Sequence, residues 1–212
     1  MQLTFLEYGI LLAFLIAIFS LLILIRKTFK FGRKKLRSEP QGRELNGIIY
    51  AFGQGMLPWE KESAAKHLPT YIGGIFYHAG LFTTFFYVFL RLFRVPVSDT
   101  ILIIFQIILG LGFIFGIGLF IKRISVSSLR KISCPDDFCA NILVDGFILL
   151  ALLEMLLGGI WPVLNIITIV VLLYVPAGKI RHCFFFFYSR ILFGMFFGRR
   201  KVLGHKHTEG IA

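Results

Sequence analysis

Hydrophobic residues along this chain of 212 residues gather into five long, nearly uninterrupted runs separated by polar segments. Each run has about 20 residues, the length that a helix needs to cross a hydrocarbon core roughly 30 Å thick. The runs cover residues 3–25, 71–93, 100–121, 138–157 and 162–182. This pattern predicts an all-α membrane protein, a five-transmembrane-helix bundle that forms a single membrane domain.

The composition agrees with this prediction. Apolar residues make up 57% of the chain, charged residues only 16%, and the mean hydropathy is +0.82. A soluble globule has too little polar surface to cover so many apolar side chains. The first run is too long for the core of a signal peptide and lacks a basic start and a cleavage pattern, so we expect it to be retained. Three cysteines are too few for a secreted disulfide framework, and we expect reduced thiols.

Lys and Arg residues are distributed unevenly between the two sides of the predicted bundle. Of the 23 in the chain, ten lie in segment 26–70, four in 122–137 and seven in 179–212, whereas the opposite side holds only Arg91 and Arg94. Because cytoplasmic loops carry the excess of positive charge, we expect the N-terminus outside and the C-terminus in the cytoplasm. Topology then accounts for the net charge of +12, and a nucleic-acid partner is not expected.

Two polar segments are thus expected in the cytoplasm, the loop 26–70 and the tail 183–212. The loop starts with basic residues interleaved with Phe, which suits anionic lipid headgroups. Residues 59–67 are typical of a short amphipathic helix at the bilayer interface, or equally of a surface that docks a cytoplasmic partner. His205 and His207 in the tail are expected to be solvated.

Two histidines share one predicted depth. His78 falls about two turns inside the cytoplasmic end of the second run, where an ionisable group marks a functional site. His182 ends the fifth run, which crosses in the opposite direction. Two histidines at one depth on antiparallel helices are what a haem with two imidazole ligands needs. His78 and His182 are therefore the candidate axial ligands of a haem iron, and a buried, hydrogen-bonded histidine is the alternative for each.

The residues around this pair allow two interpretations. Small residues flank His78, at Gly73, Gly74, Ala79 and Gly80. They leave space for a flat macrocycle, but small residues also serve close packing between membrane helices. Four basic residues lie at the same rim, at Lys122, Arg123, Lys179 and Arg181. They are candidate partners of haem propionates or, alternatively, anchors at the cytoplasmic surface.

His67 is a third candidate ligand. It precedes His78 by eleven residues, a spacing that returns to nearly the same helical face about 16 Å away and suits a second haem. However, Pro69 is expected to break the helix between them. The other ligand of a second haem would have to be His205 or His207, so an interfacial or partner-contacting role for His67 is the alternative.

Both histidine motifs resemble those of a known family. Residues 76–82 read Phe-Tyr-His-Ala-Gly-Leu-Phe, similar to a Phe-His-x-Gly motif, and residues 176–182 read Pro-Ala-Gly-Lys-Ile-Arg-His, similar to Pro-x-Ser-[Lys/Arg]-x-x-His. In these motifs the chain resembles the cytochrome b subunits of the respiratory nitrate reductase gamma family. That family includes membrane subunits of heterodisulfide reductase and of the complex linked to dissimilatory sulfite reductase.

The resemblance implies the membrane anchor of a respiratory complex in the cytoplasmic membrane of a prokaryote, rather than an enzyme on its own. Such a subunit passes electrons through haem b between membrane quinone, menaquinone or ubiquinone, and a cytoplasmic iron–sulfur partner. In the nitrate reductase type, further histidines bind a second haem near the outer face. Here those places fall near Val88, Leu164 and Asn165, so the resemblance implies one haem near the cytoplasmic face.

Quinone chemistry also needs a proton acceptor. Acidic residues within the runs are few, and Glu154 is the most conspicuous, because a lone carboxylate at that depth would be protonated or hydrogen-bonded. Glu154 is our candidate for proton handling, with a structural hydrogen bond to a neighbouring helix as the alternative. For Asp145 we expect a contact with the helix rim or with Lys179 and Arg181, without a functional role.

Other site chemistries find little support. Cys134 and Cys139 are five residues apart, which differs from the Cys-x-x-Cys spacing of zinc sites, and an iron–sulfur cluster needs four thiolates. Two other function classes stay open. One is a small transporter, although internal repeats and a polar stripe are missing. The other is a membrane anchor or assembly subunit without redox activity.

Overall fold

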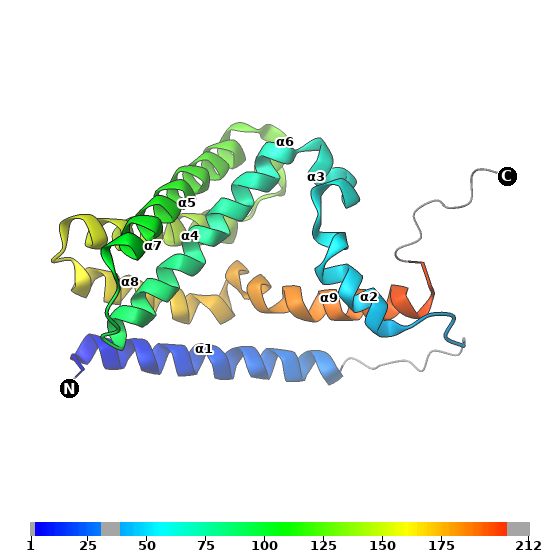
Figure 1. Ribbon diagram of the computed structural model, residues 1–212, viewed down its shortest axis with the longest axis horizontal. Helices are drawn as coiled ribbons and strands as arrows, with labels where there is room; N and C mark the ends of the chain where they lie inside the picture. Colours follow the sequence, from blue (N-terminus) through cyan, green and yellow to red (C-terminus); the bar gives the residue numbers. More distant parts are fainter. Residues whose placement is uncertain (1–2, 31–38, 203–212) are drawn as a thin grey trace. The chain divides into compact units, whose positions relative to one another are not determined.

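A computed structural model of the protein describes residues 3–30 and 39–202. No strand occurs in this described part, which confirms the predicted all-α class. The chain divides into two compact units, one formed by Met1–Ile23 and Pro69–Arg181, the other by Leu24–Leu68 and His182–Ala212 (Figure 1). His205 and His207, and residues 31–38 of the basic segment, lie outside the described residues.

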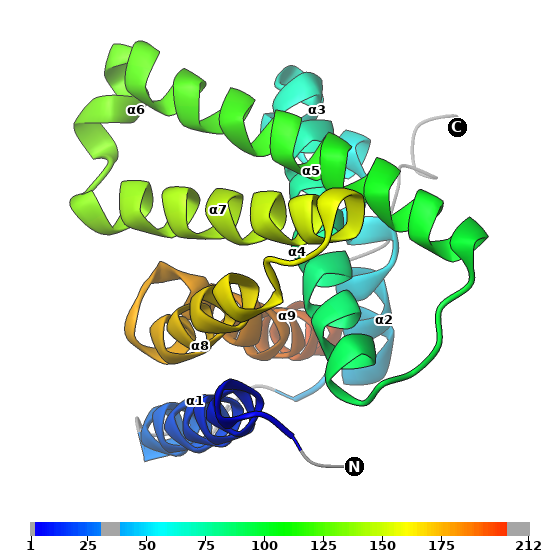
Figure 2. The same cartoon turned by 90° about the vertical axis from the view of Figure 1, so that its left-hand side faces the viewer.

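The first unit is a helical bundle. Its helices are α1 (Phe5–Lys30, as far as Ile23), α4 (Leu68–Leu92, from Pro69), α5 (Asp99–Ser125), α6 (Ser127–Ile132), α7 (Pro135–Leu157) and α8 (Trp161–Ala177), followed by the 3-10 turn η3 (Lys179–Arg181). The α5 and α7 helices lie side by side and antiparallel, joined through α6, and α8 packs beside α7 (Figure 2). Fully buried side chains fill the space between them, among them Leu109, Phe147, Ile148, Leu164 and Val171.

Helix α4 crosses α5 where two glycines meet. A Cβ atom on Gly80 would lie 3.0 Å from the Cα atom of Gly112, and one on Gly112 would lie 2.8 Å from the Cα atom of Gly80. Close contact between backbones is the usual role of small residues in membrane helix pairs. The packing interpretation of Gly80 is therefore confirmed.

Five helices of the described chain are long and apolar enough to cross a membrane, which makes this a multi-pass membrane protein. Four of them, Phe5–Phe29, Leu68–Leu92, Asp99–Ser125 and Pro135–Leu157, confirm the first four predicted runs. The fifth is Lys179–Arg199, in the segment that we expected to be mostly cytoplasmic tail.

The predicted fifth run, 162–182, differs from the structure because its helix stops early. Helix α8 has 17 residues and ends at Ala177. Pro176 removes a backbone donor from the last turn, and the Tyr174 ring occupies the space that a side chain at position 178 would need. At about 1.5 Å per residue α8 is roughly 25 Å long, close to the minimum for a span.

The second unit is built on a helix pair. It contains α2 (Glu44–Phe52), two 3-10 turns (Gln54–Met56 and Pro58–Glu60), α3 (Glu62–Lys66) and α9 (His182–Arg199). Helices α2 and α9 lie side by side (Figure 1) and touch through glycines, since a Cβ on Gly198 would lie 2.8 Å from the Cα of Gly47. The predicted helix 59–67 is interrupted at Lys61, and Trp59 is 66% exposed.

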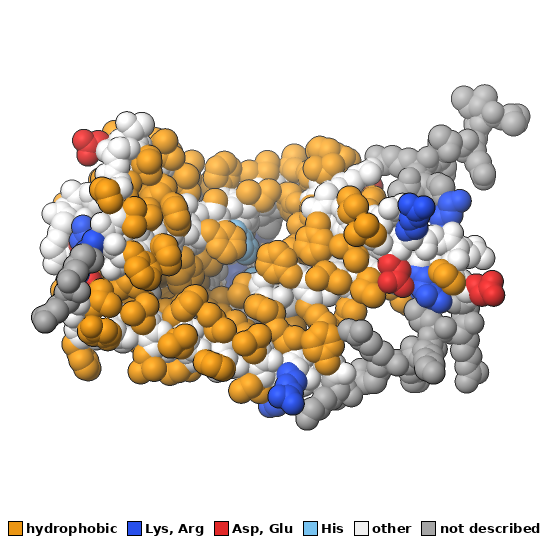
Figure 3. Space-filling model, turned by 60° about the horizontal axis from the view of Figure 1, so that its bottom comes forward, with side chains coloured by type: hydrophobic (Ala, Val, Ile, Leu, Met, Phe, Trp, Pro, Cys, Tyr) orange, Lys and Arg blue, Asp and Glu red, His pale blue; other side chains and the backbone are white. Residues whose placement is uncertain are grey.

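Apolar side chains cover much of the outer surface of the helices (Figure 3). In the first unit Phe82, Ile107, Ile114, Ile142 and Leu157 are each more than half exposed. Water would make such exposure unfavourable over so many residues, whereas lipid tails cover it without cost. The surface thus agrees with a bilayer around the helices.

Candidate functional site

His78 is the best-defined candidate ligand. It lies on α4, ten residues after Leu68 and therefore about 15 Å along the helix axis, with an exposed side chain. Its Nδ1 atom lies 2.7 Å from the carbonyl oxygen of Gly74, one turn earlier. Because a carbonyl only accepts, Nδ1 carries a proton in this contact, and in the neutral ring the lone pair is then on Nε2. Metal-binding histidines are commonly oriented through this kind of second hydrogen bond.

The small residues around His78 differ in whether they serve helix packing or leave space for a macrocycle. Gly73 packs against α5, where a Cβ would lie 3.1 Å from the Phe115 ring, and Gly80 meets Gly112 as described above. Gly74 differs, since a Cβ there would meet no atom within 4 Å. Beside the His78 imidazole, α4 therefore presents an open, flat stretch of backbone at Gly74, which is the feature that a macrocycle requires.

His182 is the first residue of α9 and has an exposed side chain. We expected it at the end of the fifth run, but α8 ends five residues earlier, and η3 separates the two helices. His182 belongs to the second unit, whereas His78 belongs to the first. The structure therefore describes each imidazole within its own unit, and pairing of the two remains a prediction.

His67 ends α3 and stands outside the regular part of α4. Its backbone, at φ −129° and ψ 43°, is not helical, and α4 begins at the next residue with Pro69 in its first turn. The predicted break between His67 and His78 is confirmed, so the eleven-residue spacing does not put them on one helical face. His67 is exposed and lies in the same unit as His182.

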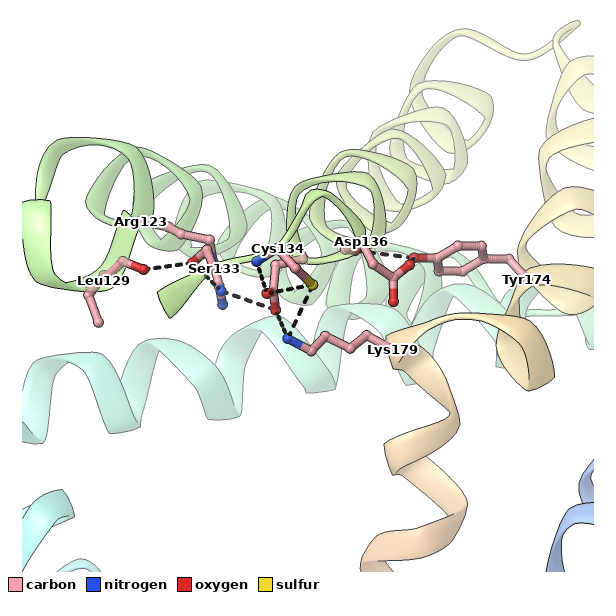
Figure 4. Close-up of polar contacts among 8 residues, drawn as sticks. Arg123, Leu129, Ser133, Cys134, Asp136, Tyr174 and Lys179 are labelled. Carbon is pink, nitrogen blue, oxygen red and sulfur yellow. Dashed lines mark hydrogen bonds and ion pairs between the residues drawn. The ribbon is translucent and has the colours of Figure 1, made fainter. Parts of the chain in front are cut away.

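Lys179 is held in a polar cluster at one end of the first unit (Figure 4). Its Nζ atom lies 2.6 Å from Oδ1 of Asp137, and an Arg123 nitrogen lies 3.2 Å from the same oxygen. Tyr174 reaches Asp136 beside this cluster, donating to its backbone carbonyl at 3.2 Å. Through the contact with Asp137, Lys179 joins η3 to the start of α7. Its role toward haem propionates stays a prediction. Arg181 is exposed.

Cys134 belongs to the same cluster. It caps the N-terminus of α7, where its backbone N–H donates to Oδ2 of Asp137 at 2.9 Å and its thiol contacts that oxygen at 3.4 Å (Figure 4). All three cysteines of the chain are free, as expected. Within residues 3–30 and 39–202, no group of three or more His, Cys, Asp or Glu side chains lies close enough to hold a metal ion. Cys134 thus has a capping role.

Both carboxylate oxygens of Glu154, near the C-terminal end of α7, have partners. Oε1 pairs with Arg91 at 3.1 Å, and Oε2 accepts the backbone N–H of Ile160 at 2.8 Å. The guanidinium of Arg91 also lies over the Trp161 ring, 5.0 Å from its centroid. Beside it, the buried Glu7 pairs with Arg94 at 2.7 Å. The carboxylate that we predicted for proton handling is therefore part of an ion-paired layer.

A cavity of about 470 Å³ opens beside this layer. Its lining combines Tyr87, Arg91, Arg94 and Glu154 with apolar residues such as Leu102 and Met155. Ligand pockets for small organic molecules have this size and this mixture of apolar walls and a few polar groups. Tyr87 and Arg91 were not predicted, because nothing in the local sequence indicates that α4 and α7 meet at this point.

A second buried polar group was also missed. Asn141 and Asp145 on α7 meet Tyr77 of α4 inside the first unit, and Asp145 is only 5% exposed. The sequence offered one signal, a carboxylate and an amide spaced four residues apart on one helix face. Asp145 was expected to contact the rim or Lys179 and Arg181, but Lys179 pairs with Asp137 instead.

The second unit carries most of the positive charge. Over the whole sequence, its segments hold 15 Lys and Arg against five Asp and Glu, which is +10 of the net +12. Burial, and the positive charge of the nearby Arg190, lower the pKa of Lys61. A net positive charge of this size attracts anionic lipid headgroups or an acidic protein partner.

Comparisons of the chain with protein-family models, with curated proteins and with solved structures gave no match.

Proposed function

We propose that this protein is a cytochrome b-like membrane subunit that carries electrons between membrane quinone and a cytoplasmic iron–sulfur partner. One haem b is bound through Nε2 of His78 and through His182. The protein works as the electron-transfer subunit of a larger oxidoreductase complex in the cytoplasmic membrane of a prokaryote. The N-terminus lies outside and the C-terminus in the cytoplasm.

The observation that carries this proposal is the arrangement around His78. The exposed imidazole has its Nδ1–H directed to the carbonyl oxygen of Gly74. Gly74 also differs from Gly73 and Gly80 in that a Cβ atom there would meet no atom within 4 Å. A histidine that serves only helix packing would be expected to face a neighbouring helix. The His78 side chain is instead exposed, with the rings of Tyr77 and Phe82 on the same helix beside it.

The quinone ring is proposed to bind in the cavity beside Glu154. Tyr87 lines that cavity nine residues after His78, which is about 14 Å along α4. Glu154 is ion-paired with Arg91, and an ionised carboxylate is the state that accepts a proton when quinol is oxidised. Arg91 and Tyr87 supply donors for the quinone oxygens.

The iron–sulfur partner is proposed to dock on the basic second unit. Placing α2 and α9 on the cytoplasmic side keeps the positive charge of that unit where the positive-inside rule requires it. Helix α9 is long and apolar enough to span, but Arg190 near its middle and Arg199 at its end favour a helix along the bilayer surface. The fifth span of the proposed topology is then α8.

The test is an optical spectrum of membranes that contain the protein. Dithionite-reduced minus oxidised spectra should show a b-type haem, and a quinol analogue should reduce the same haem when dithionite is left out. Arg91→Leu should slow quinol reduction at least tenfold while leaving the dithionite-reduced spectrum unchanged. A haem that quinol does not reduce would contradict the quinone link. A colourless protein would favour the membrane anchor without redox activity.

A further inference from the structure

The four buried carboxylates of the first unit differ in how their charge is balanced. Glu7 pairs with Arg94, Glu154 with Arg91, and Asp137 with both Lys179 and Arg123, at distances of 2.6–3.2 Å. Within the described part of the chain, Asp145 forms no ion pair, and its Oδ1 atom is buried without a hydrogen-bond partner. Asp145 is thus the exception among four similar groups.

The neighbours of Asp145 are all neutral. On its own helix, Asn141 donates from Nδ2 to Oδ2 of Asp145 at 2.8 Å. From α4, the Tyr77 hydroxyl lies beside the carboxylate, accepts from Asn141 Nδ2 at 3.2 Å and donates to the Asn141 carbonyl at 3.3 Å. From α5, the backbone of Gly116 packs directly against Oδ1. The carboxylate therefore has two neutral hydrogen-bonding neighbours, the Asn141 amide and the Tyr77 hydroxyl, and no cation. An ionised carboxylate in such surroundings has a high desolvation cost that these neutral groups do not offset.

One added proton resolves this imbalance. A proton on Oδ1 removes the charge and turns the unpartnered oxygen into a donor, and the adjacent Tyr77 oxygen can accept from it while still donating to Asn141. We propose that Asp145 is a proton-binding site inside the membrane domain and holds its proton as a neutral carboxylic acid at neutral pH. The ligand is a proton rather than a metal cation, because the Gly116 backbone fills the space beside Oδ1 that a coordination shell would need.

The proton site lies close to the candidate haem ligand. Tyr77 immediately precedes His78, and the two rings lie 6.3 Å apart between centroids. A proton stored at Asp145 is therefore next to the segment that carries the candidate haem ligand. The proton site itself does not depend on the proposed function, since it follows from contacts among α4, α5 and α7.

Infrared spectroscopy of the purified protein at neutral pH tests the proposal. The C=O stretching band of a protonated carboxylic acid should be present, should shift in deuterium oxide, and should disappear in Asp145→Asn, which keeps the size and neutrality of the protonated residue. Glu154→Gln and Asp137→Asn, whose carboxylates are ion-paired, should leave this band unchanged. Labelling with carbon-13 aspartate assigns the band in the wild-type chain and does not require that a variant folds.

Three outcomes would overturn the proposal. One is a wild-type spectrum in which the labelled aspartates show only carboxylate bands. Another is a protonated-acid band that survives Asp145→Asn. The third is a band that vanishes when sodium replaces potassium at constant pH, which would make Asp145 a cation site. Loss of haem from the preparation, by contrast, would count against the proposed function and leave the band in place.

Discussion

At the scale of single residues, the candidate site depends on the partner of each polar side chain, because the surroundings have a low dielectric constant. The sequence made His78 and Glu154 candidates by their depth in apolar runs, and His182 by its place at the predicted end of one. It did not identify their partners, because Arg91 and Glu154 are 63 residues apart, and only the fold brings them together. The same limit explains why Asp145 was assigned to the rim, since its contact with Tyr77 depends on how α4 packs against α7.

The open backbone beside His78 leads to a prediction for Gly74→Leu. A leucine side chain there should block the haem and reduce haem content at least fivefold, with little change in thermal stability, because a Cβ at this position meets no atom within 4 Å. Haem per protein and thermal unfolding in detergent measure both effects. Gly110→Leu is the matched control, since its surroundings are equally open. Full haem content in Gly74→Leu would mean that the haem does not lie over this stretch.

At the scale of elements, hydropathy predicted four of the spans. It failed for the fifth run, where backbone geometry determines the end of the helix. Long apolar runs determine α1, α4, α5 and α7, because any helix of that length is stable in lipid. The fifth run failed at Pro176, which ends α8 while the side chains remain apolar. The turn between α7 and α8 depends on Gly158 and Gly159, at φ 70° and 80°, values that favour glycine.

The contact between α2 and α9 leads to a prediction for Gly198→Ala. The new methyl group would lie 2.8 Å from the Cα of Gly47 and 2.9 Å from the carbonyl oxygen of Arg43, so the helices must separate. Overpacking of this kind lowers stability by about 1–3 kcal/mol. Thermal unfolding and protease sensitivity of α2 are the measurements. Gly110→Ala should be neutral or slightly stabilising, because alanine favours helix and the site is open. Equal behaviour of the two variants would exclude tight packing at Gly198.

At the scale of the whole molecule, the distribution of Lys and Arg along the sequence predicts one orientation, with the N-terminus outside. The two ends of the first unit differ, since Arg91 and Arg94 lie at one end, whereas Lys179, Arg123 and Cys134 lie at the other. The sequence predicted this separation from charge counts alone. It did not predict that α9 would form a long apolar helix, because the count treated the tail as polar.

Natural cysteines allow this orientation to be measured. Cys134 and Cys139 are exposed at the basic end of the first unit. A membrane-impermeant maleimide should therefore label them in inside-out vesicles and leave them unlabelled in right-side-out vesicles. The double variant Cys134→Ser, Cys139→Ser controls for labelling of Cys183. Labelling only from the outer side would reverse the proposed topology.

The central claim is that one haem b is held by His78 and His182, and the most direct measurement is the dithionite-reduced minus oxidised spectrum of three alanine variants. Our account predicts that His78→Ala and His182→Ala each abolish the b-type band, while His67→Ala keeps it at one haem per chain. A band that is lost in His67→Ala and kept in His78→Ala would contradict the assignment of His78. A protein that shows no haem before any substitution would contradict the claim as a whole.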